Sequence, residues 1–201
     1  MAMYPATVSI KRPEISSRLL LFLRPILLFP HLGWVLLYSI AAGLVSLAAL
    51  CAIIVVGRNP RPTWEFGVRY LRYVTRLSAY ASLLTDVYPP FHSREEGLYP
   101  VRIRIEYPQK IYRFQALFRG LILIPQFFFG VGYSFVMMFV AFAVFWVVLF
   151  RGRIPEGLWG LVQRYFVWQY RLNAYVLLLI DEYPPFNGLQ PLAAEEGFAE
   201  D

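Results

Sequence analysis

The strongest constraint on the fold is an internal repeat with an offset of 95 residues (99 − 4 = 95). At this offset Tyr4–Phe91 aligns with Tyr99–Phe186, and 29 of the 88 positions are identical without an insertion. A period of this length is too long for a solenoid unit and indicates a duplicated domain. We therefore expect two domains, residues 4–91 and 99–186, followed by a tail of residues 187–201. Membrane proteins often contain such repeats, related by a pseudo-two-fold axis.

The composition indicates a membrane protein. The chain is 58% apolar and only 16% charged, whereas soluble domains carry roughly 25% charged residues. The net charge is +6 although the tail is acidic, and the basic residues flank apolar runs rather than forming a separate basic domain. This arrangement favours anionic lipid headgroups over nucleic acid as the partner. We expect no cleavable signal peptide, because the apolar region extends from residue 18 to residue 56.

Each repeat begins with a short alternating segment. In the second copy Val101, Ile103 and Ile105 alternate with charged residues, which is the period-two pattern of a strand. Residues 6–11 of the first copy alternate in the same way. A lone strand is unstable in water. We expect the two strands to pair with each other across the pseudo-two-fold axis; pairing with a partner protein is the alternative.

A long apolar run follows in each copy. Leu32–Val56 and Phe127–Phe150 contain no charged residue. As helices these runs would be about 36–37 Å long, enough to cross a hydrocarbon core of about 30 Å. Pro30 and Pro125 interrupt the pattern before each run, and a Gly-Arg-x-Pro sequence ends it.

Two topologies of these runs remain open. In the first, each run crosses the membrane once and the repeats are inverted. In the second, each apolar stretch (25–56 and 120–150) forms a re-entrant hairpin. The positive-inside rule favours the hairpin, because basic residues flank both ends of both runs. No aligned glycine or proline marks a central turn, since Gly43 aligns with Met138, and this favours the single crossing.

Each repeat ends with an amphipathic helix, predicted over about Trp64–Asp86 in the first copy. One side is basic and aromatic, and the opposite side is small or moderately apolar. We expect such a helix to lie at the level of the lipid headgroups and to pack through its small side against another helix. The sequence Tyr-Pro-Pro-Phe then ends the helix, because proline cannot donate the amide hydrogen that a helix needs. The basic and aromatic side consists of Arg69, Arg72, Tyr73, Arg76 and Tyr80.

The candidate site consists of the polar residues of this helix that recur in both copies. They are Arg69, Arg76, Tyr80 and Asp86, with Arg164, Arg171, Tyr175 and Asp181. In one interpretation their guanidinium groups bind the phosphate of lipid headgroups. In the other, Arg76 pairs with Asp181 and Arg171 with Asp86, which fixes the two repeats together. We expect four further arginines to be interfacial anchors: Arg18, Arg24, Arg113 and Arg119.

The sequence offers little for catalysis or metal binding. The two histidines, His31 and His92, align with Gln126 and Asn187, so neither is repeated. We find no glycine-rich phosphate loop and no nucleophile elbow. We therefore expect no metal, no cofactor and no enzymatic activity. A pigment or quinone against the aromatic second run is the alternative to aromatic residues that face lipid or pack.

These motifs together resemble an uncharacterised family of bacterial membrane proteins, a domain of unknown function that often occurs as a tandem repeat. The resemblance covers residues 4–186. It depends on the Tyr-Pro strand start, Gly-Arg-x-Pro, and Arg-x-x-Ala-Tyr followed by Asp-x-Tyr-Pro-Pro-Phe. The resemblance implies a bacterial inner membrane and supplies no activity.

We therefore expect a mainly α integral membrane protein with two tandem repeats. Each contains a short strand, an apolar transmembrane or re-entrant segment, and an amphipathic interfacial helix. The first functional hypothesis is a non-enzymatic accessory or scaffolding subunit of a bacterial inner-membrane complex, with protein partners at its strand edges. The alternatives are an anionic-lipid-binding or membrane-shaping protein and a small transporter. The transporter is less favoured, because the apolar runs lack the charged residues of transport paths.

Overall fold

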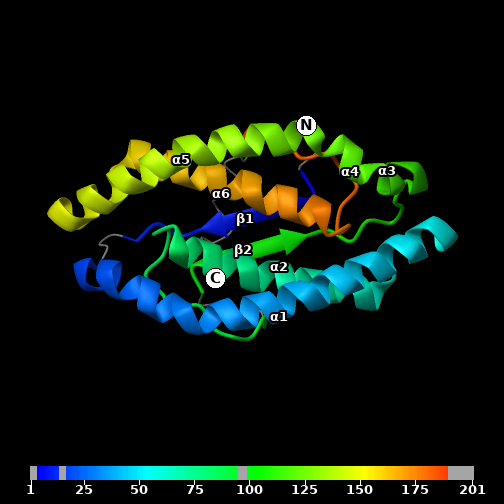
Figure 1. Ribbon diagram of the computed structural model, residues 1–201, viewed down its shortest axis with the longest axis horizontal. Coiled ribbons are helices and arrows are strands. Elements are labelled where there is room, and N and C mark those ends of the chain that lie inside the picture. Colours follow the sequence, from blue (N-terminus) through cyan, green and yellow to red (C-terminus); the bar gives the residue numbers. More distant parts are fainter. Residues whose placement is uncertain (1–3, 14–16, 95–98, 190–201) are drawn as a thin grey trace.

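The computed structural model describes residues 4–13, 17–94 and 99–189. The predicted acidic tail lies outside the described residues from residue 190 onward. The fold is mainly helical, and its elements follow the repeat (Figure 1). The first copy contains β1 (Ala6–Ile10), α1 (Arg18–Val56) and α2 (Arg61–Ala81). The second contains β2 (Val101–Ile105), α3 (Arg113–Leu117), α4 (Arg119–Ile122), α5 (Ile124–Arg151) and α6 (Glu156–Val176).

The two strands form an antiparallel ribbon in which Val8 lies opposite Ile103. These two residues are counterparts in the repeat (8 + 95 = 103). The pseudo-two-fold axis therefore passes through this pair, perpendicular to the ribbon. Val8 and Ile103 are buried on one face of the ribbon, whereas Arg104 is exposed on the other. The prediction that the strands pair with each other across the axis is confirmed.

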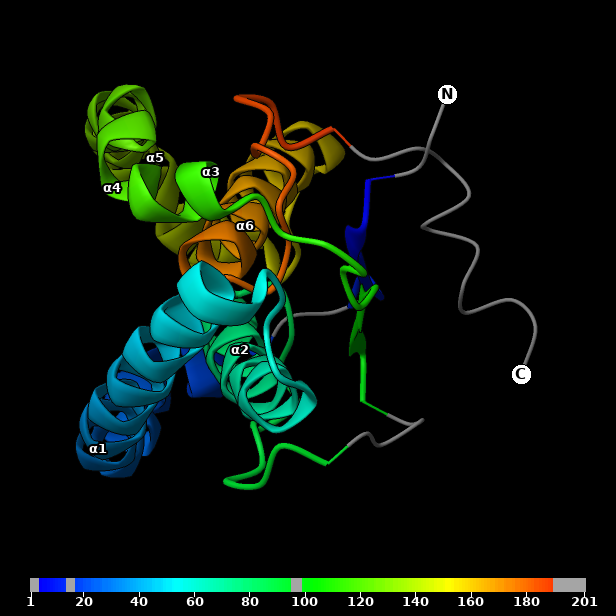
Figure 2. The same ribbon diagram turned by 90° about the vertical axis from the view of Figure 1, so that its right-hand side faces the viewer.

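The molecule has three layers along this axis (Figure 2). The ribbon forms one face, α2 and α6 form the middle layer, and α1 and α5 form the layer farthest from the ribbon. β2 packs on α2 and β1 on α6, while α1 packs on α2 and α5 on α6. The α1 and α5 helices run in opposite directions (Figure 1). The axis is therefore perpendicular to the long directions of both the ribbon and the outer helices.

The first apolar run belongs to one continuous helix, α1, which is 39 residues long. The re-entrant hairpin is wrong for both runs, because α1 and α5 each continue without a turn. Pro25 and Pro30 lie inside α1, so the expected interruption at Pro30 is also wrong. A proline removes one hydrogen bond, and packing against α2 supports the helix over this length. In the second copy the helix does begin anew, with Pro125 in the first turn of α5, where proline is tolerated.

The predicted amphipathic helices are α2 and α6, which form the middle layer. α2 keeps one exposed side, with Glu65 and Arg69. α2 ends at Ala81, before the predicted Asp86, because Leu83 adopts a left-handed conformation with φ 62°. Its counterpart Leu178 has φ 60°. Of the predicted basic and aromatic side, Tyr73, Arg76 and Tyr80 are buried. The expected contact of this side with headgroups is therefore wrong for these three residues, because α1, α6 and β2 enclose this part of α2.

Candidate functional site

The outer layer presents a long apolar surface. On α1 the buried stripe contains Ala42, Ala49 and Ile53. At 100° per residue, the side opposite this stripe is exposed and apolar. The counterpart helix α5 has the same division. Both helices are long and apolar enough to cross a membrane. The following side chains of this surface are each more than half exposed: Phe29, Leu36, Ile40, Leu44 and Leu47 of α1, and Phe128, Phe135, Phe139, Phe142 and Phe150 of α5.

Arginines join the ends of the outer helices. The guanidinium group of Arg18, at the start of α1, donates to the carbonyl of Phe150 at the end of α5 at 3.0 Å. Arg113 donates to the carbonyl of Val55, at the end of α1, also at 3.0 Å. A cation at a helix C-terminus is favourable, because the last carbonyls lack backbone partners and carry partial negative charge. Arg18 therefore joins the start of α1 to the end of α5, and Arg113 of α3 joins the second repeat to the end of α1.

The two predicted aspartates form largely buried ion pairs inside their own repeats. Asp86 binds the guanidinium group of Arg24 at 2.6 Å and accepts the N–H of Ser17 at 2.7 Å. Arg24 also donates to the carbonyl of Tyr80 and lies 4.4 Å from the centre of its ring. Arg24 is only 4% exposed, so its expected role as an interfacial anchor is wrong.

The second repeat has the same cluster. Arg119 binds Asp181 at 3.1 Å, donates to the carbonyl of Tyr175 at 2.5 Å and lies 4.0 Å from that ring's centre. Like Arg24, Arg119 is buried, at 5% exposure, and is no interfacial anchor. Sequence reasoning placed these two arginines outside the site. Their recurrence at an offset of 95 inside an apolar stretch was the signal that could have identified them.

The other two buried arginines lie across the axis from tyrosines. Arg76 lies 4.8 Å from the ring centre of Tyr99, and Arg171 lies 4.9 Å from that of Tyr4. Each pair joins a residue of one repeat to a residue of the other. The expected pairs of Arg76 with Asp181 and Arg171 with Asp86 are wrong, because Arg119 and Arg24 bind these carboxylates. Burial lowers the pKa of Arg171.

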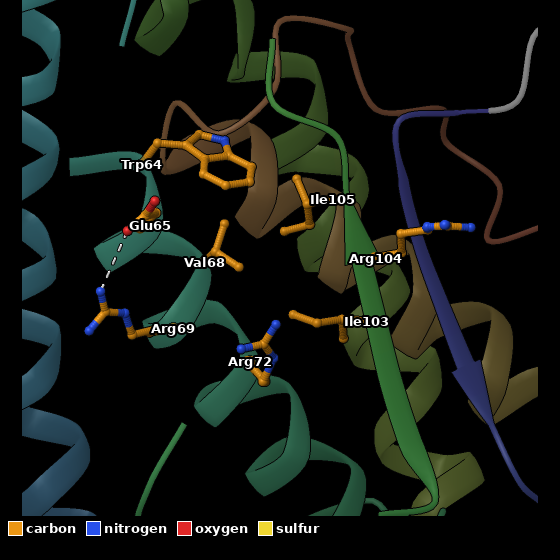
Figure 3. A pocket seen from close by; sticks show the side chains of 8 residues that line it. All are labelled: Trp64, Glu65, Val68, Arg69, Arg72, Ile103, Arg104 and Ile105. Carbon is orange, nitrogen blue, oxygen red and sulfur yellow. Dashed lines mark ion pairs between the residues drawn. The ribbon is translucent and has the colours of Figure 1, made fainter. Parts of the chain in front are cut away.

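Burial also excludes Arg76 and Arg171 as headgroup ligands, since each is only 2% exposed. Tyr80 and Tyr175 are fully buried. Of the eight predicted site residues, Arg69 and Arg164 remain exposed. Arg69 forms an exposed ion pair with Glu65 at 3.7 Å (Figure 3).

A buried histidine lies between α1 and the segment that follows α2. The ring nitrogens of His31 contact the hydroxyl groups of Tyr73 at 2.7 Å and Tyr88 at 2.9 Å. Its ring stacks on Phe91 at 4.1 Å. The counterpart Gln126 accepts from the Trp168 indole at 3.0 Å and donates to the carbonyl of Pro184. Both polar side chains are thus satisfied, and their role is to attach the Tyr-Pro-Pro-Phe segments. Among the described residues no group of three or more His, Cys, Asp or Glu could hold a metal.

Two surface grooves flank the exposed side of α2. One, of about 400 Å³, lies between α2 and β2 (Figure 3). In this view Ile103 and Ile105 point towards α2, while Arg104 points away from it. The other groove, of about 580 Å³, lies between α1, α2 and the segment 91–94. Arg69 and Arg72 line both grooves.

The chain matches one family model twice. The family is described as "Domain of unknown function (DUF4389)", and the matches cover residues 18–93 and 113–187. The two matches begin 95 residues apart, as the internal repeat requires. Neither the curated proteins nor the solved structures contain a match to the chain.

Proposed function

The chain belongs to the DUF4389 family, and we propose that it is a non-enzymatic membrane protein whose α1 and α5 lie in the plane of one leaflet, where it shapes or scaffolds the membrane. The observation that supports this proposal is a change of polarity along the pseudo-two-fold axis. At one end of the axis the ribbon presents Arg104 to the surface. At the other end α1 and α5 present exposed apolar side chains.

The exposure of the outer helices favours a membrane over water. Only 17% of an 18-residue apolar stretch of each helix is buried. A helix that is hydrophobic around most of its circumference is stable inside a large core or a membrane. Soluble monomers rarely expose contiguous apolar patches larger than a few hundred Å². Hydrocarbon is therefore the environment that suits this layer.

The direction of the axis favours an in-plane arrangement over a crossing. If α1 and α5 crossed the bilayer, the axis would lie in the membrane plane, because it is perpendicular to both helices. The ribbon and the middle layer would then lie at the depth of the bilayer centre. That position would expose the edges of a two-stranded ribbon and the charge of Arg104 at this depth. Hydrocarbon accommodates neither open strand edges nor unpaired charges.

An in-plane arrangement places every layer in a suitable environment. The outer helices would be about 58 Å and 42 Å long at 1.5 Å per residue. Along the axis the molecule as a whole is amphipathic, with apolar outer helices at one end and the exposed Arg104 of the ribbon at the other. Amphipathic structures insert into the boundary between headgroups and acyl chains and respond to curvature. Two long helices inserted in one leaflet expand that leaflet alone, which bends the membrane. This arrangement offers no path across the bilayer, so we do not propose a transporter.

The ribbon supports a second candidate function, that of an accessory subunit of a bacterial inner-membrane complex. Within the described residues, β1 and β2 pair only with each other. Each strand therefore has an outer edge to which a partner protein could add a strand. Isolation of the protein as a monomer under gentle extraction with lipid would count against this candidate.

The in-plane proposal is tested by the depth of three positions on α1. Phe29, Ile40 and Cys51 lie within about 40° of one another on the helix and cover about 33 Å of its length. All three are exposed, and Cys51 is the chain's single cysteine. Three proteins with one cysteine each are labelled with a fluorophore. They are the native protein, Phe29→Cys with Cys51→Ser, and Ile40→Cys with Cys51→Ser. Quenching by lipids that carry a quencher at known depths then measures the depth of each label.

We expect the three depths to agree, and a label at exposed Arg104 of the ribbon, introduced as Arg104→Cys with Cys51→Ser, to be unquenched in the same vesicles. A deep Ile40 with shallow Phe29 and Cys51 would show a crossing and refute the proposal. Electron microscopy of the vesicles then tests the shaping activity, which predicts tubes or smaller vesicles with rising protein content.

A further inference from the structure

The groove between α1, α2 and the segment 91–94 combines arginines with aromatic side chains. Arg69, Arg72 and Arg94 line it, as do Trp34 and Tyr38 of α1. The described residues that line it include no acid. Three guanidinium groups at one groove attract an anion, and their planar donors match the oxygens of a phosphate group.

The groove lies beside the apolar surface of α1. Trp34 and Tyr38 occupy the flank of the helix, between its exposed side and the stripe that packs on α2. Trp34 is 46% exposed. Trp and Tyr are enriched where hydrocarbon meets headgroups, since their rings are apolar and their N–H or O–H groups are polar. With α1 in the leaflet, this groove lies at the depth of lipid phosphates.

The first repeat has features that hold the groove open. Arg72 donates to the carbonyl of Ser93 at 3.0 Å, and the Tyr38 hydroxyl lies 3.5 Å from the Ser93 hydroxyl. The side chain of Arg72 extends from α2 to Ser93, so it separates the segment 91–94 from the backbone of α2. The segment therefore forms a wall of the groove instead of covering α2.

The second repeat lacks these features. Val167 replaces Arg72, and Gly188 and Leu189 replace Ser93 and Arg94. The backbone at Gly188 lies directly against α6, because an added Cβ would be 1.7 Å from the carbonyl oxygen of Arg164. Of the three arginine positions, the second repeat keeps only Arg164, the counterpart of Arg69. The two repeats have therefore diverged at this place although they share one fold.

We propose that the groove of the first repeat binds the phosphate of an anionic phospholipid headgroup, with Arg69, Arg72 and Arg94 as donors. This site rests on the in-plane arrangement proposed above, which brings the groove to the headgroups. The acyl chains then follow the exposed side of α1. The site replaces the predicted headgroup ligands Arg76 and Arg171, which are buried.

The test measures lipid binding by the full-length protein. Delipidated protein in detergent is titrated with phosphatidylglycerol, with phosphatidylcholine and with inorganic phosphate, and native mass spectrometry counts the bound molecules. The variant Arg69→Gln with Arg94→Gln changes two exposed side chains. The matched control is Arg164→Gln, which removes the exposed counterpart of Arg69 in the second repeat.

We expect phosphatidylglycerol to bind more tightly than phosphatidylcholine. The double variant should bind it about 100-fold more weakly, since one charge-assisted hydrogen bond contributes on the order of tenfold. The control should bind like the unaltered protein. Equal binding by the double variant would overturn the proposal. If inorganic phosphate displaced the lipid at equal concentration, the site would belong to free phosphate, and the assignment to a lipid would be wrong.

The depth measurement separates this inference from the proposed function. It is made in phosphatidylcholine alone, and Arg69→Gln with Arg94→Gln should leave the three depths unchanged. Depths that show a crossing would refute the in-plane arrangement whatever the lipid preference. Equal depths without a preference for phosphatidylglycerol would refute the headgroup site alone.

Discussion

Val8 lies opposite Ile103 in the ribbon, and each residue is the other's counterpart in the repeat. One pair of side chains thus marks the axis that relates the ribbon, the middle layer and the outer helices. Since both residues are buried against the middle layer, the junction of the two repeats belongs to the core. The ribbon therefore determines how the two halves of the chain are arranged.

The first prediction is that cysteines at these two positions form a disulfide. The N–H groups of Lys11 and Glu106 donate to the carbonyls of Pro100 and Pro5. Hydrogen-bonded and non-hydrogen-bonded pairs alternate along an antiparallel ladder, so Val8 and Ile103 form a non-hydrogen-bonded pair. The Cα atoms of such a pair lie about 4.5 Å apart, which is within the range of a disulfide. In a Cys51→Ser background, Val8→Cys with Ile103→Cys should lose both thiols on oxidation. Closing so long a loop should raise the free energy of unfolding by about 2–4 kcal/mol.

The control for this disulfide is Val8→Cys with Ile105→Cys. Ile105 lies opposite Ala6, so it is the diagonal neighbour of Val8, at about 7–8 Å. It should oxidise slowly or not at all. If both pairs formed disulfides equally well, the register of the ribbon would be wrong. Thiol counting by maleimide labelling gives the readout.

The second prediction concerns the ion pair of Arg24 and Asp86. Arg24→Met leaves a largely buried carboxylate without its partner, and this should lower the free energy of unfolding by about 3 kcal/mol. Asp86→Asn should cost a similar amount, and the double variant less than the sum, as a double-mutant cycle in detergent would show. The exposed Glu65 provides the control, since Glu65→Ala should cost less than about 0.5 kcal/mol. Additive single effects would show that Arg24 and Asp86 do not stabilise each other.

The third prediction compares two glycines of the middle-layer helices, Gly67 of α2 and Gly160 of α6. A Cβ on Gly67 of α2 would lie 2.7 Å from a methyl carbon of Leu179, whereas one on Gly160 of α6 meets nothing within 4 Å. Gly160→Ala should therefore stabilise the protein by about 0.5–1 kcal/mol through helix propensity. Gly67→Ala should instead destabilise it by about 1–3 kcal/mol, because Leu179 must move.

Thermal unfolding compares these two variants directly. Adding Leu179→Ala to Gly67→Ala gives the new methyl group room, so this double variant should cost less than the sum of its single changes. Stabilisation by both alanines would mean that α2 and the segment after α6 do not meet at Gly67.

The fourth prediction is a loss of stability at high pH. Burial, with a smaller effect of Tyr88, raises the pKa of Tyr73 to about 12 from its ordinary value of 10.0. The folded protein therefore keeps this phenol protonated at pH values where the unfolded chain releases the proton. The stability that Tyr73 contributes is present below pH 10 and is lost as the pH rises from about 10 to about 12.

Tyr73→Phe checks this assignment. At pH 8 the variant should be less stable by about 1–3 kcal/mol, because the ring nitrogen of His31 loses its partner. The difference from the unaltered protein should then shrink as the pH rises above 10. A constant difference across this range, measured by thermal unfolding in detergent, would contradict the raised pKa.

The sequence predicted the parts of the fold that local pattern and repetition control. Alternation at Val101, Ile103 and Ile105 predicted β2, and the repeat predicted that β1 pairs with it. Gly57 and Gly152, both with positive φ, end the apolar helices where Gly-Arg-x-Pro predicted. The candidate site was predicted less well, because Arg76 and Asp86 are close in sequence but have different partners.

The sequence by itself thus determined the two repeats, their elements and the apolar character of α1 and α5, since periodicity and composition act locally. The tertiary structure alone decided that Arg24 binds Asp86 and that Arg76 lies against Tyr99. It also decided that the axis is perpendicular to the outer helices. These features depend on residues brought together from distant parts of the chain. A buried arginine binds the carboxylate that the fold brings next to it. The spacing of residues along the sequence does not determine which carboxylate that is.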